Sequence, residues 1–198
     1  MKELLQRNAE WAAERVAADP GYFKRLSDIQ TPHYFWIGCS DSRVPANVIA
    51  GLEPGEVFVH RNVANLVNPG DLNCLSVLQF AVEALKVREI IVTGHYGCGG
   101  IAAAVDGERH GIIDHWLQPI RDTAAQCHEE LDKLTDQRAR LDRLCELNVM
   151  AQVRRVAETP IVQDAWKSGQ PLLVHGLVYG LTDGRLRNLG CTLPRPKE

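Results

Sequence analysis

Reactive side chains follow two apolar segments of this sequence. Cys39, Asp41 and Arg43 follow the segment HYFWIG (33–38), and His95 and Cys98 follow the segment EIIVTG (89–94). Alternate side chains of an extended chain point to the same side, so the first three are expected on one face. If the two segments are parallel strands, their carboxyl ends meet at the edge of the sheet where α/β proteins bind ligands. The two groups are therefore expected to form one site.

This set of side chains is typical of a zinc site. Zinc is bound by thiolate sulfur and imidazole nitrogen in tetrahedral geometry and tolerates a carboxylate. Each residue alone has a simpler interpretation, because many cysteines are buried thiols and many histidines are structural. Their clustering favours one zinc ion per chain, held by Cys39, His95 and Cys98, with water or Asp41 in the fourth position. The nearby glycines match neither the dinucleotide motif nor the phosphate-loop motif, so no nucleotide site is expected.

Helices and strands alternate along the chain, which predicts parallel βαβ units. The expected helices cover residues 2–18, 45–51, 75–85, 112–158 with an interruption near Thr135, and 161–169; the expected strands cover 33–38, 56–61, 89–94, 171–180 and 185–191. Thr182, Asp183 and Gly184 form a hairpin signal, which makes the last strand antiparallel. The fold class is therefore α/β, with a mostly parallel central sheet of four to five strands, a C-terminal antiparallel strand and flanking helices. Residues 1–30 are expected to form a helical arm, and residues 31–198 a single zinc-binding core.

Composition and charge exclude several classes of protein. The chain has 198 residues and a net charge of -3, with a pI near 6.2, so neither a nucleic-acid partner nor an anionic membrane is expected. Its apolar runs are too short to span a bilayer, and Glu3 and Arg7 stand where a signal peptide would be apolar. A cytoplasmic location is expected, in which the six cysteines are thiols or metal ligands rather than disulfides.

The reactive residues lie in motifs that resemble a known family. CSDSRVP, followed some fifty residues later by GHYGCGG, is similar to the β-class carbonic anhydrases, and HRNVAN and HGLVYG extend the similarity along the chain. The resemblance is to the bacterial type, with features of its bicarbonate-regulated subgroup. It implies a zinc enzyme that hydrates carbon dioxide reversibly to bicarbonate and a proton. It also implies a homodimer or homotetramer in which the N-terminal arm wraps the neighbouring subunit.

The residues allow a mechanism of that kind. Zinc turns bound water into hydroxide near neutral pH, and the hydroxide attacks carbon dioxide. Asp41 is the expected acceptor of a hydrogen bond from the hydroxide, and Arg43 can grip Asp41 as a bidentate fork that keeps it ionised and away from the metal. Backbone N–H groups of Gly99 and Gly100 can hold a substrate oxygen. No residue is identified as a proton shuttle.

The resemblance implies further site residues. An apolar carbon dioxide pocket shared across a dimer interface corresponds here to Gln30, Phe58, Val63 and Phe80, although the last three could equally be plain core. A second, non-catalytic bicarbonate site corresponds to Trp36, Arg61 and Tyr179. The alternative for that site is a core tryptophan, an arginine paired with a carboxylate and a tyrosine that caps the hairpin.

Two other functions are open on the same residues. One is hydrolysis of carbonyl sulfide or carbon disulfide at the same metal site. The other is a structural zinc closed by Asp41 in a non-catalytic protein, against which Arg43 argues, because a permanent ligand needs no arginine to hold it off the metal. The other six histidines are expected to form no cluster, and Cys74, Cys127, Cys145 and Cys191 show no ligand spacing.

Overall fold

A computed structural model of the chain describes residues 1–28 and 30–194, which form two compact units, Met1–Thr31 and Pro32–Glu198. The first unit contains α1 (Lys2–Ala18) and α2 (Tyr22–Leu26). The Trp11 ring packs edge-on against Tyr22 and Phe23, with centroid separations of 6.4 and 5.8 Å. The sequence predicts α1 and its end at Asp19 but not α2, because a helix of five residues is too short for a clear apolar period.

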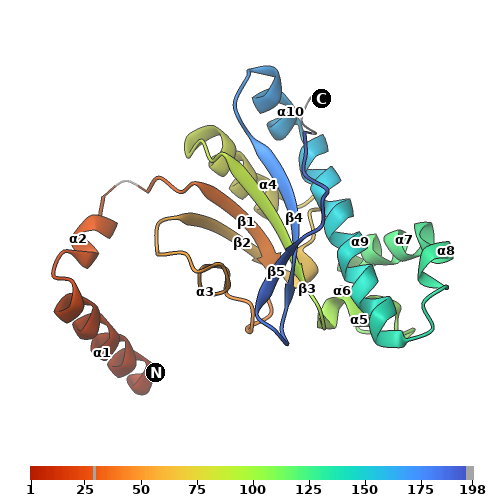
Figure 1. Cartoon of the computed structure of the whole chain (residues 1–198), viewed down its shortest axis with the longest axis horizontal. Coiled ribbons are helices and arrows are strands. Elements are labelled where there is room, and N and C mark those ends of the chain that lie inside the picture. Colours follow the sequence, from red (N-terminus) through yellow and green to blue (C-terminus); the bar gives the residue numbers. More distant parts are fainter. Residues whose placement is uncertain (29, 195–198) are drawn as a thin grey trace. The chain divides into compact units, whose positions relative to one another are not determined.

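The second unit is built on the expected mixed sheet, which has five strands in the order β2-β1-β3-β4-β5 (Figure 1). The strands are β1 (Tyr34–Cys39), β2 (Val57–Asn62), β3 (Glu89–His95), β4 (Leu173–Gly180) and β5 (Arg185–Asn188). The first four are parallel, and β5 runs antiparallel to β4. The register places Gly38 of β1 between Arg61 of β2 and Thr93 of β3.

The helices confirm the alternation but differ in detail. They are α3 (Ala46–Ala50), η1 (Val63–Asn65), α4 (Leu72–Gln79), η2 (Phe80–Ala84), α5 (Gly99–Val105), α6 (Ile113–Trp116), α7 (Gln118–Gln126), α8 (His128–Leu131), α9 (Gln137–Glu158) and α10 (Pro160–Lys167). Four helices occupy residues 112–158: the expected interruption near Thr135 is confirmed between α8 and α9, but the continuous helix expected before it is wrong. Breaks at Leu117 and Cys127 separate the first three. The first break comes just before Pro119, which lacks the N–H that would continue the preceding helix.

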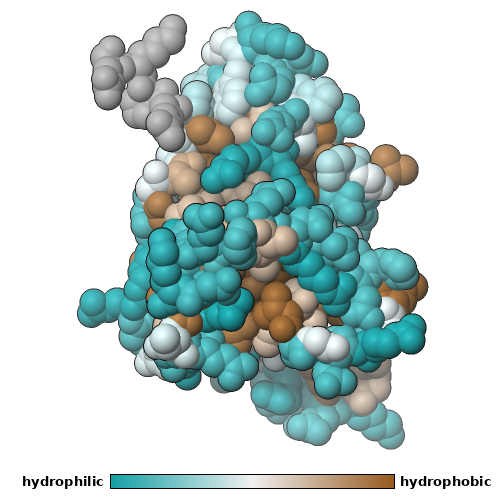
Figure 2. Space-filling model, turned by 90° about the vertical axis from the view of Figure 1, so that its right-hand side faces the viewer, coloured by the Kyte–Doolittle hydropathy of each residue, from teal (hydrophilic) through white to brown (hydrophobic). Residues whose placement is uncertain are grey.

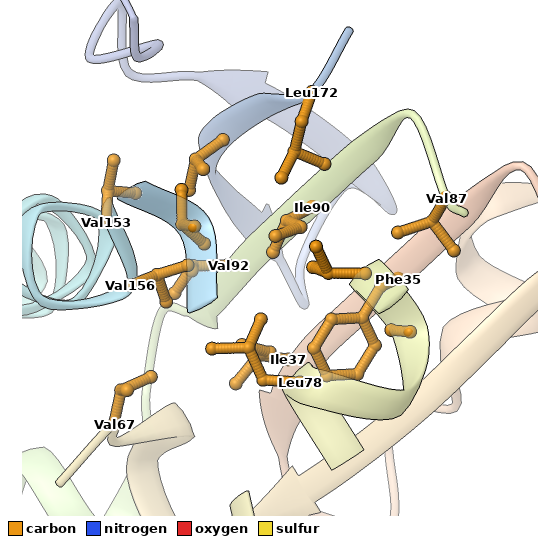
Figure 3. Close-up of a cluster of buried hydrophobic side chains, with 14 of the residues drawn as sticks. Phe35, Ile37, Val67, Leu78, Val87, Ile90, Val92, Val153, Val156 and Leu172 are labelled. Carbon is orange, nitrogen blue, oxygen red and sulfur yellow. The ribbon is translucent and has the colours of Figure 1, made fainter. Parts of the chain in front are cut away.

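One face of the sheet carries the main core. Side chains of β1, β3 and β4 pack against α4, η2, α9 and α10, as Figure 3 shows for Phe35, Leu78, Ile90 and Val153. Gly176 of β4 lets α9 approach closely, because a Cβ there would lie 3.1 Å from Val149 and Val153. The position of α9 against the carboxyl ends of the strands is thus fixed by close packing.

A second buried cluster lies where the strands end. It joins Cys39, Ala64, Cys98 and Val178 to side chains of α5, α7 and α9. The side of the molecule seen in Figure 2 is mostly hydrophilic, with small separate apolar patches. Within residues 1–28 and 30–194, no helix is both long and apolar enough to cross a membrane.

Candidate metal centre

Three potential zinc ligands converge at the carboxyl end of the sheet. Cys39 is the last residue of β1, His95 is the last of β3, and Cys98 is the N-cap of α5. One ligand atom from each lies within 4.8 Å of the others, and the two Sγ atoms are 3.9 Å apart. All three side chains are buried. The sequence prediction that the two motifs form one site agrees with this geometry.

The three donors fit zinc. Tetrahedral zinc with Zn–S bonds of 2.3 Å keeps two sulfurs about 3.8 Å apart, close to the separation found here. His95 Nδ1 lies 3.2 Å from the Tyr96 carbonyl oxygen, which can only accept, so Nδ1 carries the proton. Its Nε2 therefore presents a lone pair toward the sulfurs, and this buried atom has no partner within the described residues. This is the tautomer a metal-binding imidazole requires.

Because the two thiols are in contact, their pKa values differ. The hydrogen bond from the Cys98 thiol lowers the pKa of Cys39, helped by the backbone N–H groups of Asp41 and Ala64. The contact with Cys39, together with burial, raises the pKa of Cys98. A divalent cation stabilises both thiolates, so metal binding and loss of the second proton are linked.

Asp41 lies beside the three ligands and is bound by Arg43. Arg43 Nε and Nη2 donate to the two carboxylate oxygens at 2.9 and 2.7 Å, and its backbone N–H donates at 3.0 Å. These bonds hold the pKa of Asp41 well below its usual range. Asp41 Oδ2 is 3.7 Å from His95 Nε2, yet the carboxylate lies outside the 4.8 Å cluster. The chain thus offers three ligands and a charged neighbour.

Arg61 fastens the end of β1. Its Nε donates to the Cys39 carbonyl at 2.8 Å, and its Nη2 donates to the Asp41 carbonyl at 2.5 Å. Gly38 of β1 pairs with Arg61 of β2, and a Cβ on Gly38 would lie 2.4 Å from Trp36 Nε1. Trp36 and Arg61 therefore lie on the same face of the sheet. Tyr179 is on β4, three strand spacings from β2, or roughly 14 Å between backbones. The structure thus places two of the three expected bicarbonate residues side by side.

The turn after β2 is strained and is held by α9. Ala64 and Asn65 have φ of 62° and 50°, a region that non-glycine residues seldom adopt. Asn148 Nδ2 donates to the Ala64 carbonyl at 3.1 Å, and Gln152 donates to Asn148 at 2.9 Å and accepts from Val67 N–H at 3.0 Å. Both amide side chains are fully buried. This turn presents the Ala64 N–H to the Cys39 sulfur.

The same helix holds the loop of the other two ligands. It makes two hydrogen bonds there: the Cys145 thiol donates to the His95 carbonyl at 3.2 Å, and Glu146 accepts from the Tyr96 hydroxyl at 2.6 Å. No pattern in the sequence predicts these contacts, because a polar side chain on an amphipathic helix is normally solvent-facing. Helix α9 therefore positions both halves of the site.

The expected substrate residues do not all lie together. Val63 and Gly100 lie together, because a Cβ on Gly100 would be 3.0 Å from Val63, and Gly99 and Gly100 begin α5, where N–H groups lack intrahelical partners. Phe58 and Phe80 instead pack on each other, with centroids 5.8 Å apart. Phe58 pairs with Phe35, four residues before Cys39, or roughly 13 Å along the strand. Gln30 belongs to the first unit.

A second cluster of His60, Asp71 and Cys74 corrects the expectation that the other histidines and cysteines stay apart. The Asn62 amide is fixed by Leu66, which donates to its Oδ1 at 2.8 Å and accepts from its Nδ2 at 2.7 Å. That Nδ2 also lies 3.2 Å from His60 Nε2, so it donates there and the His60 proton is on Nδ1. Neither ring nitrogen is then free for a metal, and burial raises the pKa of Cys74 to about 12.

Two further histidines share a carboxylate at the opposite end of the strands, which also corrects that expectation. His33 Nε2 lies 3.2 Å from Glu89 Oε1, and His175 Nε2 lies 3.4 Å from Glu89 Oε2. His175 Nδ1 bonds Thr192 at 3.0 Å. The carboxylate lies between the two rings, an arrangement that ties β1, β3 and β4 together.

Comparison with known proteins agrees with the site. A family model described as carbonic anhydrase matches residues 34–186. A carbonic anhydrase of Emericella nidulans is 46% identical over 192 residues, which cover 97% of this chain and 84% of the relative. A tetrameric β-carbonic anhydrase of Sordaria macrospora superposes with a TM-score of 0.91 at 40% identity, covering 96% of this chain and 97% of the other. A Coccomyxa β-carbonic anhydrase in complex with acetazolamide superposes with a TM-score of 0.90 at 42% identity, covering 94% of this chain and 85% of the other.

The ligand assignment predicts the behaviour of cysteine variants. Cys39→Ser and Cys98→Ser each replace a thiolate by a hydroxyl that stays protonated at neutral pH, so bound zinc should fall well below one ion per chain. Elemental analysis of the purified variants measures this directly. Cys127→Ser, a half-buried thiol away from the cluster, should keep the parent's zinc. Full zinc in both ligand variants would contradict the assignment.

The role of α9 predicts a distant effect on the metal. Asn148→Leu leaves the Ala64 carbonyl and the Gln152 amide without a partner, which should lower the free energy of unfolding by about 1–3 kcal/mol. Displacement of the Ala64 N–H from Cys39 should also weaken zinc binding about tenfold. Urea unfolding and chelator competition measure the two effects. Gln126→Leu, at an exposed amide on α7, is the control, and equal zinc affinity in both variants would refute the positioning role.

Proposed function

This chain belongs to the β-class carbonic anhydrases, and we propose that it hydrates carbon dioxide reversibly to bicarbonate and a proton at the centre formed by Cys39, His95 and Cys98. The observation that carries the proposal is the carboxylate of Asp41 beside these donors, held by both oxygens on Arg43. A structural site closed by four protein ligands has no use for that pair. The arrangement favours a centre whose fourth position receives water.

Zinc held by these three residues would acidify a water molecule and so supply a nucleophile near neutral pH. Asp41 can accept a hydrogen bond from the attacking oxygen and orient it, because its carboxylate faces His95 Nε2 at 3.7 Å. Arg43 keeps Asp41 charged through the neutral range, since a lowered pKa means the pair is lost only as the pH falls far into the acid range. The N–H groups of Gly99 and Gly100, at the start of α5, would hold a substrate oxygen.

The Asp41–Arg43 pair predicts that activity can be lost while the metal content is kept. Asp41→Asn removes the charged acceptor and its pair with Arg43, so kcat/KM for carbon dioxide should fall about 10²-fold or more while zinc content stays near the parent's. Stopped-flow hydration at several pH values measures this. Asp122→Asn, at an exposed position, is the matched control. Assays with carbonyl sulfide and carbon disulfide test the alternative substrates, and activity on them without carbon dioxide hydration would overturn the proposal.

We further propose that the active unit contains at least two chains. Phe58, Phe80 and Gln30 are expected in the substrate pocket, yet the first two pack on each other away from the ligands of their own chain. Phe80 is 47% exposed and the nearby Leu72 is 79% exposed, which is costly for large apolar side chains unless a partner covers them. A second copy could then supply these side chains. The tetrameric relative supports this assembly.

The assembly is tested by solution mass. Light scattering should give a dimer or tetramer, and Phe80→Asp should shift the mass toward about 22 kDa with loss of activity, because it places a charge in the contact. Leu173→Asp, a substitution at another exposed apolar residue, is the control. An active species of one chain would contradict the proposal.

We also propose bicarbonate regulation through Trp36, Arg61 and Tyr179. Arg61 donates to the carbonyls of Cys39 and Asp41, so an anion that draws Arg61 away would loosen the segment that seats the Asp41–Arg43 pair. Asp41 could then move onto the metal and close the site, a state favoured as the pH falls. Tyr179→Phe should therefore reduce the bicarbonate inhibition and cooperativity seen in acid-to-alkaline activity profiles, whereas Tyr34→Phe should not. Identical profiles for parent and Tyr179→Phe would remove this site.

A further inference from the structure

Trp116 donates a hydrogen bond to the turn that borders the metal centre. It is the last residue of α6, and its Nε1 donates to the Val63 carbonyl at 2.8 Å. The indole is half-buried and packs, with Val63, on the cluster of side chains that contains Cys39 and Cys98. The bond joins positions 53 residues apart, so no motif of the sequence points to it.

The carbonyl that accepts this bond and the N–H that faces Cys39 belong to one peptide group. The Val63–Ala64 peptide is trans, so its C=O and its N–H point in opposite directions. The Ala64 N–H is one of the two backbone donors that lower the pKa of Cys39. Because the peptide is planar, one end cannot turn without the other. A carbonyl fixed toward Trp116 therefore fixes the N–H toward the Cys39 sulfur.

This peptide is held in its more strained orientation. Ala64 has φ 62° and ψ 27°, a region in which the Cβ of an L residue crowds its own backbone. A half-turn of the Val63–Ala64 peptide would take the φ of Ala64 from 62° to about −118°, on the side of the map that alanine ordinarily occupies. The same half-turn would point the N–H away from Cys39. The indole bond to the carbonyl opposes this relaxation.

Helix α6 is anchored independently of that turn. Arg121 of α7 donates to the carbonyl and to the carboxylate of Asp114 in α6, both at 2.8 Å, and to the Ala104 carbonyl of α5 at 2.9 Å. Leu117, the residue after Trp116, is fully buried. The indole therefore has a fixed support on the side away from the turn that it holds.

We propose that Trp116 is a positioning residue for the zinc ligand Cys39, because it keeps the Ala64 N–H on the Cys39 sulfur by holding the other end of the same peptide. An N–H bond to a thiolate ligand withdraws charge from the sulfur and fixes its direction, as outer hydrogen bonds do for other metal ligands. The inference rests on the proposed function through one assignment, that of Cys39 as a ligand.

Metal binding by tryptophan variants tests this role. Trp116→Phe keeps a large ring and removes the donor, so zinc affinity measured by chelator competition should fall about fivefold. Trp166→Phe is the matched control, because Trp166 Nε1 donates to the Leu172 carbonyl at the same 2.8 Å but at the opposite end of the sheet. Its zinc affinity should change less than about twofold.

Cobalt bound in place of zinc supplies a spectroscopic measure of the sulfur. A thiolate that loses an N–H bond gives up charge more readily, so the thiolate-to-cobalt charge-transfer band should move to lower energy in Trp116→Phe. The band of Trp166→Phe should coincide with that of the parent. A general loss of stability would not shift the band of the protein that remains folded.

Hydrogen exchange of the indole N–H tests the same coupling in the unaltered protein, whether or not Trp116→Phe folds. Coupling between two equilibria is reciprocal, so zinc should strengthen the Trp116 bond by the factor by which that bond strengthens zinc binding. NMR should therefore show exchange of the Trp116 Nε1–H about fivefold slower with zinc bound than after chelation. The Trp166 Nε1–H should show no comparable change.

The outcomes separate this role from the proposed function. Parent-like zinc affinity and band energy in Trp116→Phe, or equal exchange at Trp116 with and without zinc, would overturn the role. Equal losses of affinity in both tryptophan variants would also overturn it. Zinc kept in full by Cys39→Ser would remove the ligand and the role together. A parent that shows the expected metal effects but does not hydrate carbon dioxide would refute the proposed function and leave the role of Trp116 standing.

Discussion

The hydrogen bonds that α9 makes to two loops are the constraint on which the site depends. Two thiols 3.9 Å apart, a buried imidazole nitrogen with no partner among the described residues and two residues with positive φ are each unfavourable arrangements of a chain. They persist because Asn148 and Gln152 hold one loop, while Cys145 and Glu146 hold the other. The helix is itself fixed on the sheet by its close contact with Gly176. A site that is costly to assemble is thus stabilised by an element that contributes no ligand to it.

The sequence was sufficient to predict that the candidate ligands converge and insufficient to predict the residues that support them. Cys39 and His95 could be assigned because strand alternation and the ends of parallel strands determine where such side chains lie. Asn148 and Gln152 could not, because their burial depends on which turn of α9 faces the strained loop, and this is a tertiary contact. Residues 112–158 were harder to divide, because polar residues and helix propensity continue through the breaks at Leu117 and Cys127. The sheet order and the two additional histidine clusters likewise depend on contacts between distant segments.

Two buried histidines show how neighbouring groups decide between a metal ligand and a structural residue. His95 donates its Nδ1 proton to a backbone carbonyl, which leaves Nε2 as an unprotonated donor beside two sulfurs. His60 also lies near a cysteine and a carboxylate, but the Asn62 amide occupies its Nε2 and forces the proton onto Nδ1. Clusters of similar composition thus differ in chemistry because one hydrogen-bond partner is an acceptor and the other a donor. Proximity of ligand-type residues alone would not separate them.

Arg43 and Arg61 donate hydrogen bonds to the carboxylate and the carbonyls that border the metal centre. Arg43 occupies both oxygens of Asp41, and Arg61 occupies the carbonyls of Cys39 and Asp41. Arg43 also lines a hollow beside the centre, and Arg61 lies on the sheet face that carries Trp36. The chain segment from Cys39 to Arg43 is therefore held by two cations from different elements. Since a guanidinium shared between two anions binds each less strongly than it would bind one alone, the orientation of Asp41 is sensitive to charge on either side.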